Sequence, residues 1–258
     1  MPNLQKQEQW QSLIFISFVL FITFIVIFLL KSLLYKYPSL ISSISSWLPV
    51  GKKTIKGSLK QRFIAVLEHL RNQYIEIRLE AIYELVKITS DYPESHWQTM
   101  EILATFVRNN APLMAENIHN ELSAPIRSDI QAALSAIANR DASKDTENEI
   151  LDLSRTDIRG ANLVRGNLQR INLYHTNLQG ANLCEVNLQM AILSAANLEE
   201  ANLVRANLHQ AILSAANLRG ANLSHANLNG ASLFLANLQG ANLDSASLDK
   251  ANLREVSF

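Results

Sequence analysis

The chain has 258 residues, enough for one or two domains, and its formal net charge at pH 7 is zero. This balance argues against nucleic-acid binding, which leaves a basic footprint. The single cysteine, Cys184, excludes a disulfide within the chain. Glycine and proline are sparse, so the composition does not indicate long disordered stretches.

A long apolar stretch begins after a short N-terminal tail, residues 1–12. Residues 13–30 contain no charged side chain, and residues 33–35 extend the apolar stretch past Lys31. About 20 apolar residues span a bilayer core. The alternative is a cleaved signal peptide, but the apolar stretch is long, basic residues follow it, and it has no A-x-A-like cleavage site. We therefore predict a transmembrane helix over residues 13–35.

Lysines around this segment predict its orientation. Only Lys6, opposed by Glu8, precedes the segment. Six lysines, by contrast, lie near its C-terminal end or beyond it. The positive-inside rule then places everything after residue 36 in the cytoplasm and the N-terminus outside, as a single-pass membrane protein. The six lysines are Lys31, Lys36, Lys52, Lys53, Lys56 and Lys60.

Residues 36–57 form a basic juxtamembrane segment. Within it, residues 38–50 are too short to span a membrane, but Leu40, Ile44 and Trp47 lie on one face of a short helix, with serines opposite. Two interpretations stay open: an amphipathic helix at the membrane interface, or a plain linker.

Apolar residues at helical spacing predict helices packed as HEAT-like hairpins within residues 58–140. Ser58 is the expected cap of the first helix, Tyr92-Pro93 ends the second, and the third closes before Ala111-Pro112. A further short helix at 114–122 is ambiguous. The residues expected on the helix faces are Phe63, Val66, Leu67, Leu70, Leu79, Ile82, Tyr83, Val86, Trp97, Met100, Leu103, Val107, Ile130, Leu134 and Ile137.

From residue 151 to 258 the sequence has an unbroken period of five, with leucine at the third position of every complete unit except Ile158. A fixed period indicates a repeat architecture. Neither a helix nor a flat strand places all these leucines on one side, because five residues turn a helix by about 500° and reverse the face of a strand. A corner after each short extended piece removes the conflict. The first and third positions then point inward, and the other three point outward.

A second period, four units long, is superimposed on the first. AILSAANL at 191–198 recurs at 211–218, and glycine recurs in one slot at residues 160, 180, 220 and 240. Four units per coil give a square solenoid of about five coils, about 25 Å long at a strand-like spacing of about 4.8 Å. Because each coil pairs only with its neighbours, stability should grow coil by coil.

The Ala-Asn-Leu-x-x units resemble the pentapeptide-repeat family over residues 151–258. The resemblance implies a right-handed, four-sided β-helix, so the expected fold class is mixed: one transmembrane helix, a small α-helical module and this solenoid. The stretches RLEAIYELVKITSD, HWQTMEILATFVRNNAP and DIQAALSAIANR resemble a helical module that precedes the repeats in many membrane-anchored bacterial proteins and has no assigned activity. We expect the module to cover the N-terminal end of the solenoid, where strand edges would otherwise be open.

The sequence holds no motif for nucleotide binding, zinc-protease chemistry or serine hydrolysis, which predicts a non-enzymatic protein with no catalytic, cofactor-binding or metal-binding residues. The acidic residues of the polar linker at 141–150 are expected in solvent, as is the Cys184 thiol. The histidines lack metal-ligand spacing and are also expected to be exposed: His69, His96, His119, His175, His209 and His225.

Units four apart share one side of the solenoid. One side carries Arg165, Glu185 and Arg205 in successive coils, followed by His225, which predicts a structural charge ladder. Another side gathers apolar residues at outward positions, which suggests a contact site for a partner protein or a membrane. Cover by the helical module or by residues 38–50 is the alternative, and the absence of any contact is a third. The candidate contact residues are Tyr174, Ile192, Ala195, Ile212, Ala215, Phe234 and Leu235.

The sequence thus predicts a membrane-anchored, non-enzymatic scaffold that presents a rigid solenoid to a protein partner of unknown identity. At the last coil, pairing into a homodimer and plugging by Phe258 both stay open. The alternative function comes from the resemblance, since some pentapeptide-repeat proteins mimic DNA and bind DNA gyrase. That mimicry needs a strongly acidic rod, whereas residues 151–258 hold eight Lys or Arg and eight Asp or Glu.

Overall fold

The computed structural model describes residues 55–113, 126–145 and 149–258. The predicted tail at 1–12, the transmembrane helix at 13–35, most of the juxtamembrane segment at 36–57 and the short helix at 114–122 lie outside these residues. In the part of the chain that is described, no helix is long and apolar enough to cross a membrane.

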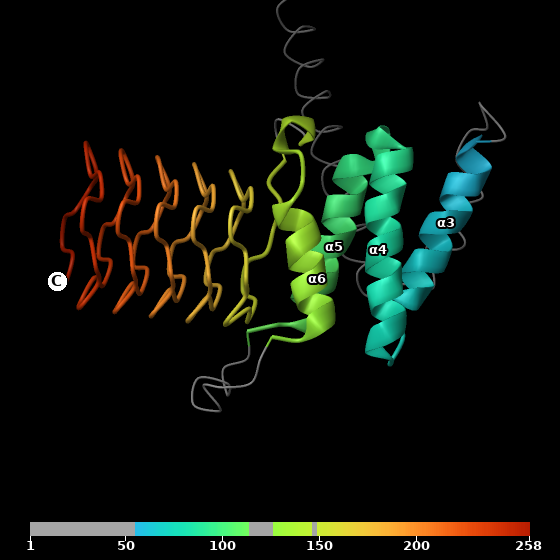
Figure 1. The fold of residues 1–258 in the computed structure, drawn as a ribbon, viewed down its shortest axis with the longest axis horizontal. Coiled ribbons are helices and arrows are strands. Elements are labelled where there is room, and N and C mark those ends of the chain that lie inside the picture. The colour runs from blue at the N-terminus through green and yellow to red at the C-terminus, as the bar shows by residue number, and fades with distance from the viewer. Residues whose placement is uncertain (1–54, 114–125, 146–148) are drawn as a thin grey trace, which may run out of the picture. The chain divides into compact units, whose positions relative to one another are not determined.

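Four α-helices precede the solenoid within the described residues (Figure 1): α3 (Ile55–His69), α4 (Ile75–Asp91), α5 (His96–Asn110) and α6 (Ser128–Ala138). Two short 3-10 helices, η2 (Pro93–Ser95) and η4 (Ala142–Lys144), follow α4 and α6. α4, α5 and α6 pack against one another. Arg62 links α3 to α4 through ion pairs of 2.7 Å to Glu84 and 2.8 Å to Asp91.

The helix boundaries and faces agree with the sequence in part. α4 and α5 end where the two prolines predict, and Ile130, Leu134 and Ile137 of α6 are all buried. Ser58 is not a cap, because α3 already begins at Ile55. The predicted face of α4 is also wrong at two positions: Tyr83 is 64% exposed and Val86 is exposed. The buried stripe of α4 runs instead through Ala81, Ile82, Leu85 and Ile88.

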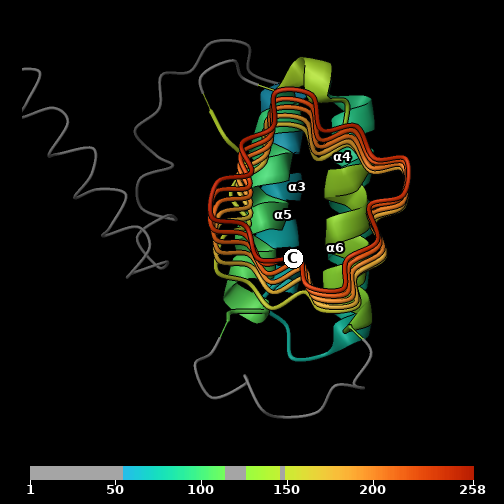
Figure 2. The same ribbon diagram turned by 90° about the vertical axis from the view of Figure 1, so that its left-hand side faces the viewer.

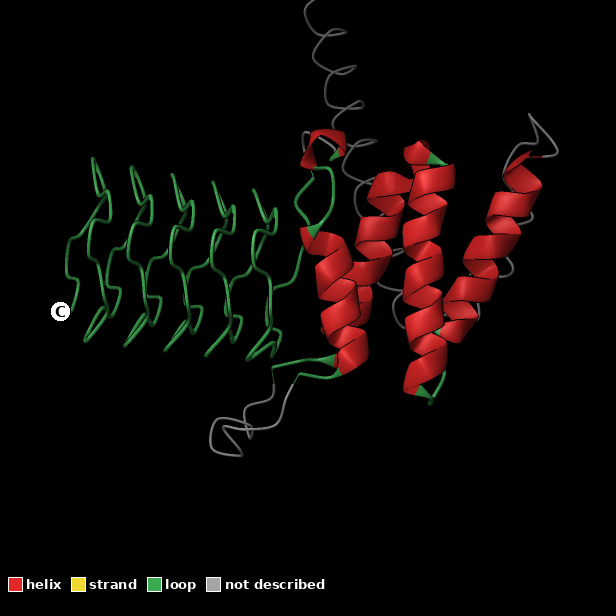
Figure 3. Cartoon of the chain, in the orientation of Figure 1, coloured by secondary structure: helices red, strands yellow, loops and turns green. Residues whose placement is uncertain are grey.

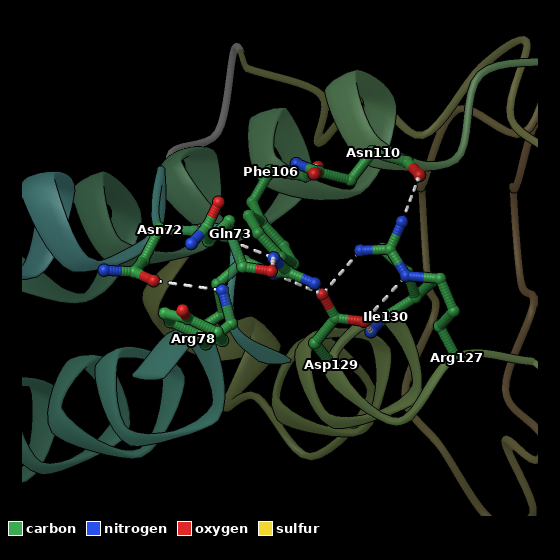
Figure 4. A network of polar contacts seen from close by, with 9 residues as sticks. Asn72, Gln73, Arg78, Phe106, Asn110, Arg127, Asp129 and Ile130 are labelled. Atoms are coloured by element: carbon green, nitrogen blue, oxygen red, sulfur yellow. Dashed lines mark hydrogen bonds and ion pairs between the residues drawn. The ribbon is translucent and has the colours of Figure 1, made fainter. Parts of the chain in front are cut away.

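A buried ionic network joins α4 to α6 (Figure 4). Asp129 is fully buried and receives hydrogen bonds from Arg78 Nε at 2.7 Å and from Arg127 Nη2 at 2.6 Å. Arg78 also donates to the carbonyls of Asn72 and Gln73, at 2.7 and 3.0 Å, which ties the loop before α4 into the same network. Each buried charge therefore has a partner, as a buried ion pair requires.

One coil of the solenoid is four units long, as the sequence predicts. Isolated parallel bridges join each second position to the residue one coil later, for example Asn162 to Asn182 and Asn182 to Asn202. Each first and third position from Leu151 to Leu238 is buried, although Gly166 brings no side chain to the core. Viewed along the axis, the coils stack in register (Figure 2). Figure 3 draws them as loops, because each unit contributes a single bridge rather than a continuous strand.

The corners are formed by the fifth position, which has a positive φ in every complete unit of the solenoid, from Arg155 (56°) to Glu255 (57°). Only five of these residues are glycine. A backbone hydrogen bond closes each turn after the first, as from the N–H of Ala161 to the carbonyl of Ile158 at 3.2 Å. The fifth-position residues that are not glycine adopt the same left-handed backbone conformation, which is energetically costly for L-amino acids. The stacking of the coils imposes this conformation on them.

Asparagine at the second position forms two kinds of side-chain hydrogen bond. Its side-chain oxygen accepts from the N–H two residues later, as Asn187 does from Gln189 at 3.2 Å, which fixes the turn. Its amide donates to the asparagine one coil earlier, as from Asn207 to Asn187 at 3.1 Å. Such bonds form asparagine ladders along three sides of the solenoid. Further rungs start at Asn187, Asn197, Asn202, Asn217 and Asn227.

The helical module covers the N-terminal end of the solenoid within residues 57–258. On one side, Arg108 of α5 donates to the carbonyl of Asp152 at 2.5 Å. On the next side, the segment after α5 pairs with the first coil. Pro112 forms an antiparallel bridge with Thr156, and the N–H of Asp157 donates to the carbonyl of Ala111 at 2.8 Å.

The other two sides of the first coil are closed by α6 and the residues after it. The Gln131 side-chain amide accepts from the N–H of Asn162 at 2.9 Å and donates to the Asn162 carbonyl at 2.8 Å, so it replaces a peptide group. The fourth side receives Arg140, which donates to the carbonyls of Asn167 and Gln169. The module thus bonds to groups that a preceding coil would otherwise pair with.

Candidate functional site

The apolar side of the solenoid comprises the units 171–175, 191–195, 211–215 and 231–235. Their second positions are bridged in sequence from Asn172 through Ile192 and Ile212 to Ser232. Tyr174, Ile212 and Leu235 remain 39, 42 and 49% exposed, and Ala215 is exposed as well. Ile192, Ala195 and Phe234 are half-buried. The predicted contact residues therefore share one side.

The asparagine ladder is interrupted on this side. It has one rung, from Asn172 to Asp152 at 2.9 Å, and then meets Ile192 and Ile212. Isoleucine cannot accept a hydrogen bond, so the N–H groups of Ser194 and Ser214 lose the side-chain acceptor that asparagine supplies at this position elsewhere. In two successive coils, side-chain hydrogen bonds of the asparagine ladder are therefore missing, and apolar surface is present in their place.

Met190 enlarges the apolar side and was not predicted from the sequence. It occupies the fifth position of the preceding unit, at the corner next to Ile192, and is 43% exposed. The available signal was a methionine in a slot that elsewhere holds mostly glycine or polar residues. At the N-terminal end of the side, the rings of Tyr174 and His175 pack edge to face, with centroids 5.9 Å apart.

Charged residues pair on other sides. Glu185 Oε2 lies 2.8 Å from Arg165 Nε, and Glu185 Oε1 lies 3.9 Å from Arg205 Nη1, which forms the charge ladder. The hydrogen bond from Arg165 lowers the pKa of Glu185, and Glu185 in turn raises the pKa of Arg165. Arg219 and Glu199 pair similarly at 3.1 Å. These contacts are exposed, so they serve to align neighbouring coils rather than to stabilise the fold strongly.

Several expectations about exposure are wrong. His96 is buried, and its Nε2 lies 3.3 Å from Asp145 Oδ1. Asp145, predicted to be a solvated linker residue, also pairs with Arg140 at 2.9 Å. Both residues thus support Arg140, which covers the first coil. Cys184 and His209 are half-buried rather than fully exposed.

A second apolar surface lies on the helical module. Tyr83 and Val86 of α4, Met100 of α5, and Ala132 and Ala136 of α6 are among the residues that line a groove of about 710 Å³. Among residues 55–113, 126–145 and 149–258, no three or more His, Cys, Asp or Glu side chains gather in a geometry suited to a metal ion.

Comparisons with known proteins match the solenoid. The family model for pentapeptide repeats matches in eight copies, at residues 152–189, 191–230 and 231–258. Among solved structures, HetL, a pentapeptide-repeat protein involved in heterocyst differentiation regulation in Nostoc, is 39% identical. That match covers 41% of this chain and 50% of HetL, with a TM-score of 0.40.

Two further solved structures are similar. Rfr23, a pentapeptide-repeat protein from Cyanothece 51142, is 38% identical over 38% of this chain and 64% of its own, with a TM-score of 0.29. QnrB1, a plasmid-mediated fluoroquinolone resistance protein, is 19% identical over 40% and 64%, with a TM-score of 0.27. The present chain thus spans between half and about two-thirds of these structures. No curated protein matches the sequence.

Proposed function

We propose that this chain, whose residues 152–258 belong to the pentapeptide-repeat family, is a membrane-anchored, non-enzymatic scaffold that binds a partner protein through the apolar side of its solenoid. Residues 13–35 hold it in the bilayer, and the helical module and solenoid lie in the cytoplasm. The solenoid offers its partner a surface fixed by bonds to both neighbouring coils. A preorganised surface loses little conformational entropy on binding.

One observation carries the proposal: Ile192 and Ile212 interrupt the asparagine ladder on the side where apolar residues are exposed. A ladder hydrogen bond contributes about 0.5–1.5 kcal/mol, and an exposed isoleucine gives nothing comparable to the isolated fold. The loss is accounted for if the isoleucines are buried by a partner. Neighbouring exposed side chains of Met190 and Leu235 extend the same surface.

The test restores the ladder. We expect the double variant Ile192→Asn/Ile212→Asn to unfold at the same or a higher temperature than the wild type, because it extends the rungs beyond Asn172, and to lose its partner. Both are measured on the full chain, by thermal unfolding in detergent and by capture from membranes. A double variant that unfolds early, or that keeps the partner, would contradict the proposal.

The matched control makes the reverse exchange on another side. Asn202→Ile/Asn222→Ile removes the rung between Asn202 and Asn182 and the turn bond to Ser224. It should lower the unfolding temperature and leave partner capture unchanged. Ile212→Glu/Phe234→Glu is a second disruptive variant, and Tyr83→Glu/Val86→Glu tests whether the groove on the helical module binds the partner instead.

The membrane topology has its own test. Cys184 is half-buried, so its labelling would report accessibility as well as topology. In a Cys184→Ser background, Ser245→Cys places a thiol at an exposed corner of the last coil. A membrane-impermeant maleimide should label it only after spheroplasts are opened, while a cysteine at Asn3 should be labelled in intact spheroplasts. The opposite pattern would reverse the orientation.

We also propose a homodimer through the last coil, where Leu253 is exposed and Phe258 is 70% exposed rather than plugging the core. Leu253→Glu/Phe258→Glu should then halve the mass measured by sedimentation. The DNA-mimic alternative is disfavoured by the balanced charge of the repeats. Inhibition of gyrase supercoiling by the purified chain would favour that alternative.

A further inference from the structure

We propose that the element of the partner that occupies the apolar side is an amphipathic α-helix lying along the solenoid axis. This inference rests on the proposed function, since it names what that surface binds. It follows from the dimensions of the apolar side, from its charge and from the pairing of its backbone.

The apolar side is long and narrow. Four coils at about 4.8 Å span roughly 15–20 Å, and three extended residues per unit make the side about 10 Å wide. A single helix, about 10 Å across, matches the width, and about 10–13 of its residues cover the length.

The backbone of the apolar side is already paired, so a partner strand cannot extend a sheet there. The N–H of Leu193 donates to the carbonyl of Ile212 at 2.7 Å, and the N–H of Ile212 donates to the carbonyl of Ala191 at 2.9 Å. Strand addition requires an open edge, and open edges of a solenoid lie at its ends. The side therefore offers a partner mainly side chains, which suits the packing of a helix.

The chemistry of the side fixes the chemistry of the helix. Its outward positions in the middle coils hold Ile192, Ser194, Ile212 and Ser214, and charged pairs such as Glu185 with Arg165 lie on another side. The complementary helix has a narrow apolar stripe, with residues at i, i+3, i+4 and i+7, flanked by uncharged or small side chains. A strongly charged helix would leave its charges without partners.

A photo-cross-linking series tests the geometry. A photoreactive phenylalanine analogue replaces Ser194, Ser214 or Phe234 in the full chain, one per variant, in three successive coils. Adducts formed in membranes are mapped to single partner residues by mass spectrometry. Because a helix rises about 1.5 Å per residue, the cross-linked position should advance by about three residues per coil within one segment. The outward position Ser224, on the charge-ladder side, is the control and should give no adduct.

The outcomes separate the two proposals. An advance of one or two residues per coil indicates an extended segment, and adducts scattered over distant segments indicate a folded surface; either overturns the helix and leaves the contact side in place. Adducts within this chain or with a second copy, or none on the apolar side while partner capture persists, overturn the proposed function and the helix together.

Discussion

The carbonyl oxygen of Ala138, the last residue of α6, accepts a 2.6 Å hydrogen bond from the N–H of Asn167 in the first coil. The residue before Asn167 is Gly166, which stands where alanine is usual in the repeat. A Cβ on Gly166 would lie 2.8 Å from the Cβ of Ala138 and 3.0 Å from the carbonyl of Leu163. The glycine thus permits the close approach of the helical module.

Gly166→Ala should therefore destabilise the chain by about 1–3 kcal/mol, because the end of α6 must shift away from the first coil. The measurement is thermal unfolding, with hydrogen exchange at Asn167 as a local readout. Ala138→Gly in the same chain removes the nearer clash and should recover part of the loss. Additive effects in this double-mutant cycle would contradict a direct contact.

The second prediction concerns the contribution of Arg140 to stability. Its side chain is 1% exposed and bonds to Asp145 and to the carbonyls of Asn167 and Gln169. Arg140→Met leaves a carboxylate and two carbonyls without their donor, so we expect a loss of about 3–5 kcal/mol in unfolding free energy. Arg140→Lys should rescue little, because an ammonium group cannot reproduce the planar fork of donors. Equal stability of the lysine variant and the wild type would refute this assignment.

A third prediction concerns acid. Burial raises the pKa of Asp129, but hydrogen bonds from Arg127 and Arg78 outweigh it, so the pKa lies below its ordinary value of 3.8. A carboxyl with a depressed folded-state pKa stabilises the fold above its unfolded pKa, and this contribution is lost as the pH falls through the folded value. Unfolding temperatures should fall with pH below about 4. Asp129→Asn should be less stable at pH 7 and should show a shallower fall; an unchanged slope would count against Asp129.

The fourth prediction isolates the cost of the corners. Gly240 has a φ of 68°, and nothing lies within 4 Å of a Cβ added there. Gly240→Ala should thus lower the unfolding free energy by about 1 kcal/mol through backbone conformation alone. Gly240→Asn should cost less, since asparagine tolerates this region. Chemical denaturation of the two variants checks this order of stability loss. A clash with neighbouring atoms would give the opposite order, because asparagine is larger than alanine.

The sequence predicts the four-unit coil because both periods are visible in it, and it groups Ile192, Ile212 and Leu235 on one side for the same reason. It does not predict the positive φ of the fifth position, because residues as different as Arg165, Ala195 and Leu235 adopt this left-handed backbone conformation. That conformation is a consequence of stacking and has no residue signature.

The contacts at the first coil could not be predicted either. Arg108, Gln131 and Arg140 are ordinary polar residues of helical segments until the first coil lies beside them. The face of α4 was misassigned because Tyr83 and Val86 are apolar and helically spaced, yet they open onto a groove rather than into the core. Periodicity alone does not distinguish these two destinations.

The Gln131 amide, paired with Asn162 as a peptide group would be, has a consequence for the order of folding. The helical module is synthesised before any repeat, so we expect it to act as a template for the first coil. Folding should then start at this end, and each completed coil should serve as a template for the next as the chain leaves the ribosome. Adding or deleting a whole coil within the solenoid leaves the contacts between the helical module and the first coil unchanged. We therefore expect the length of the solenoid to be able to vary in evolution.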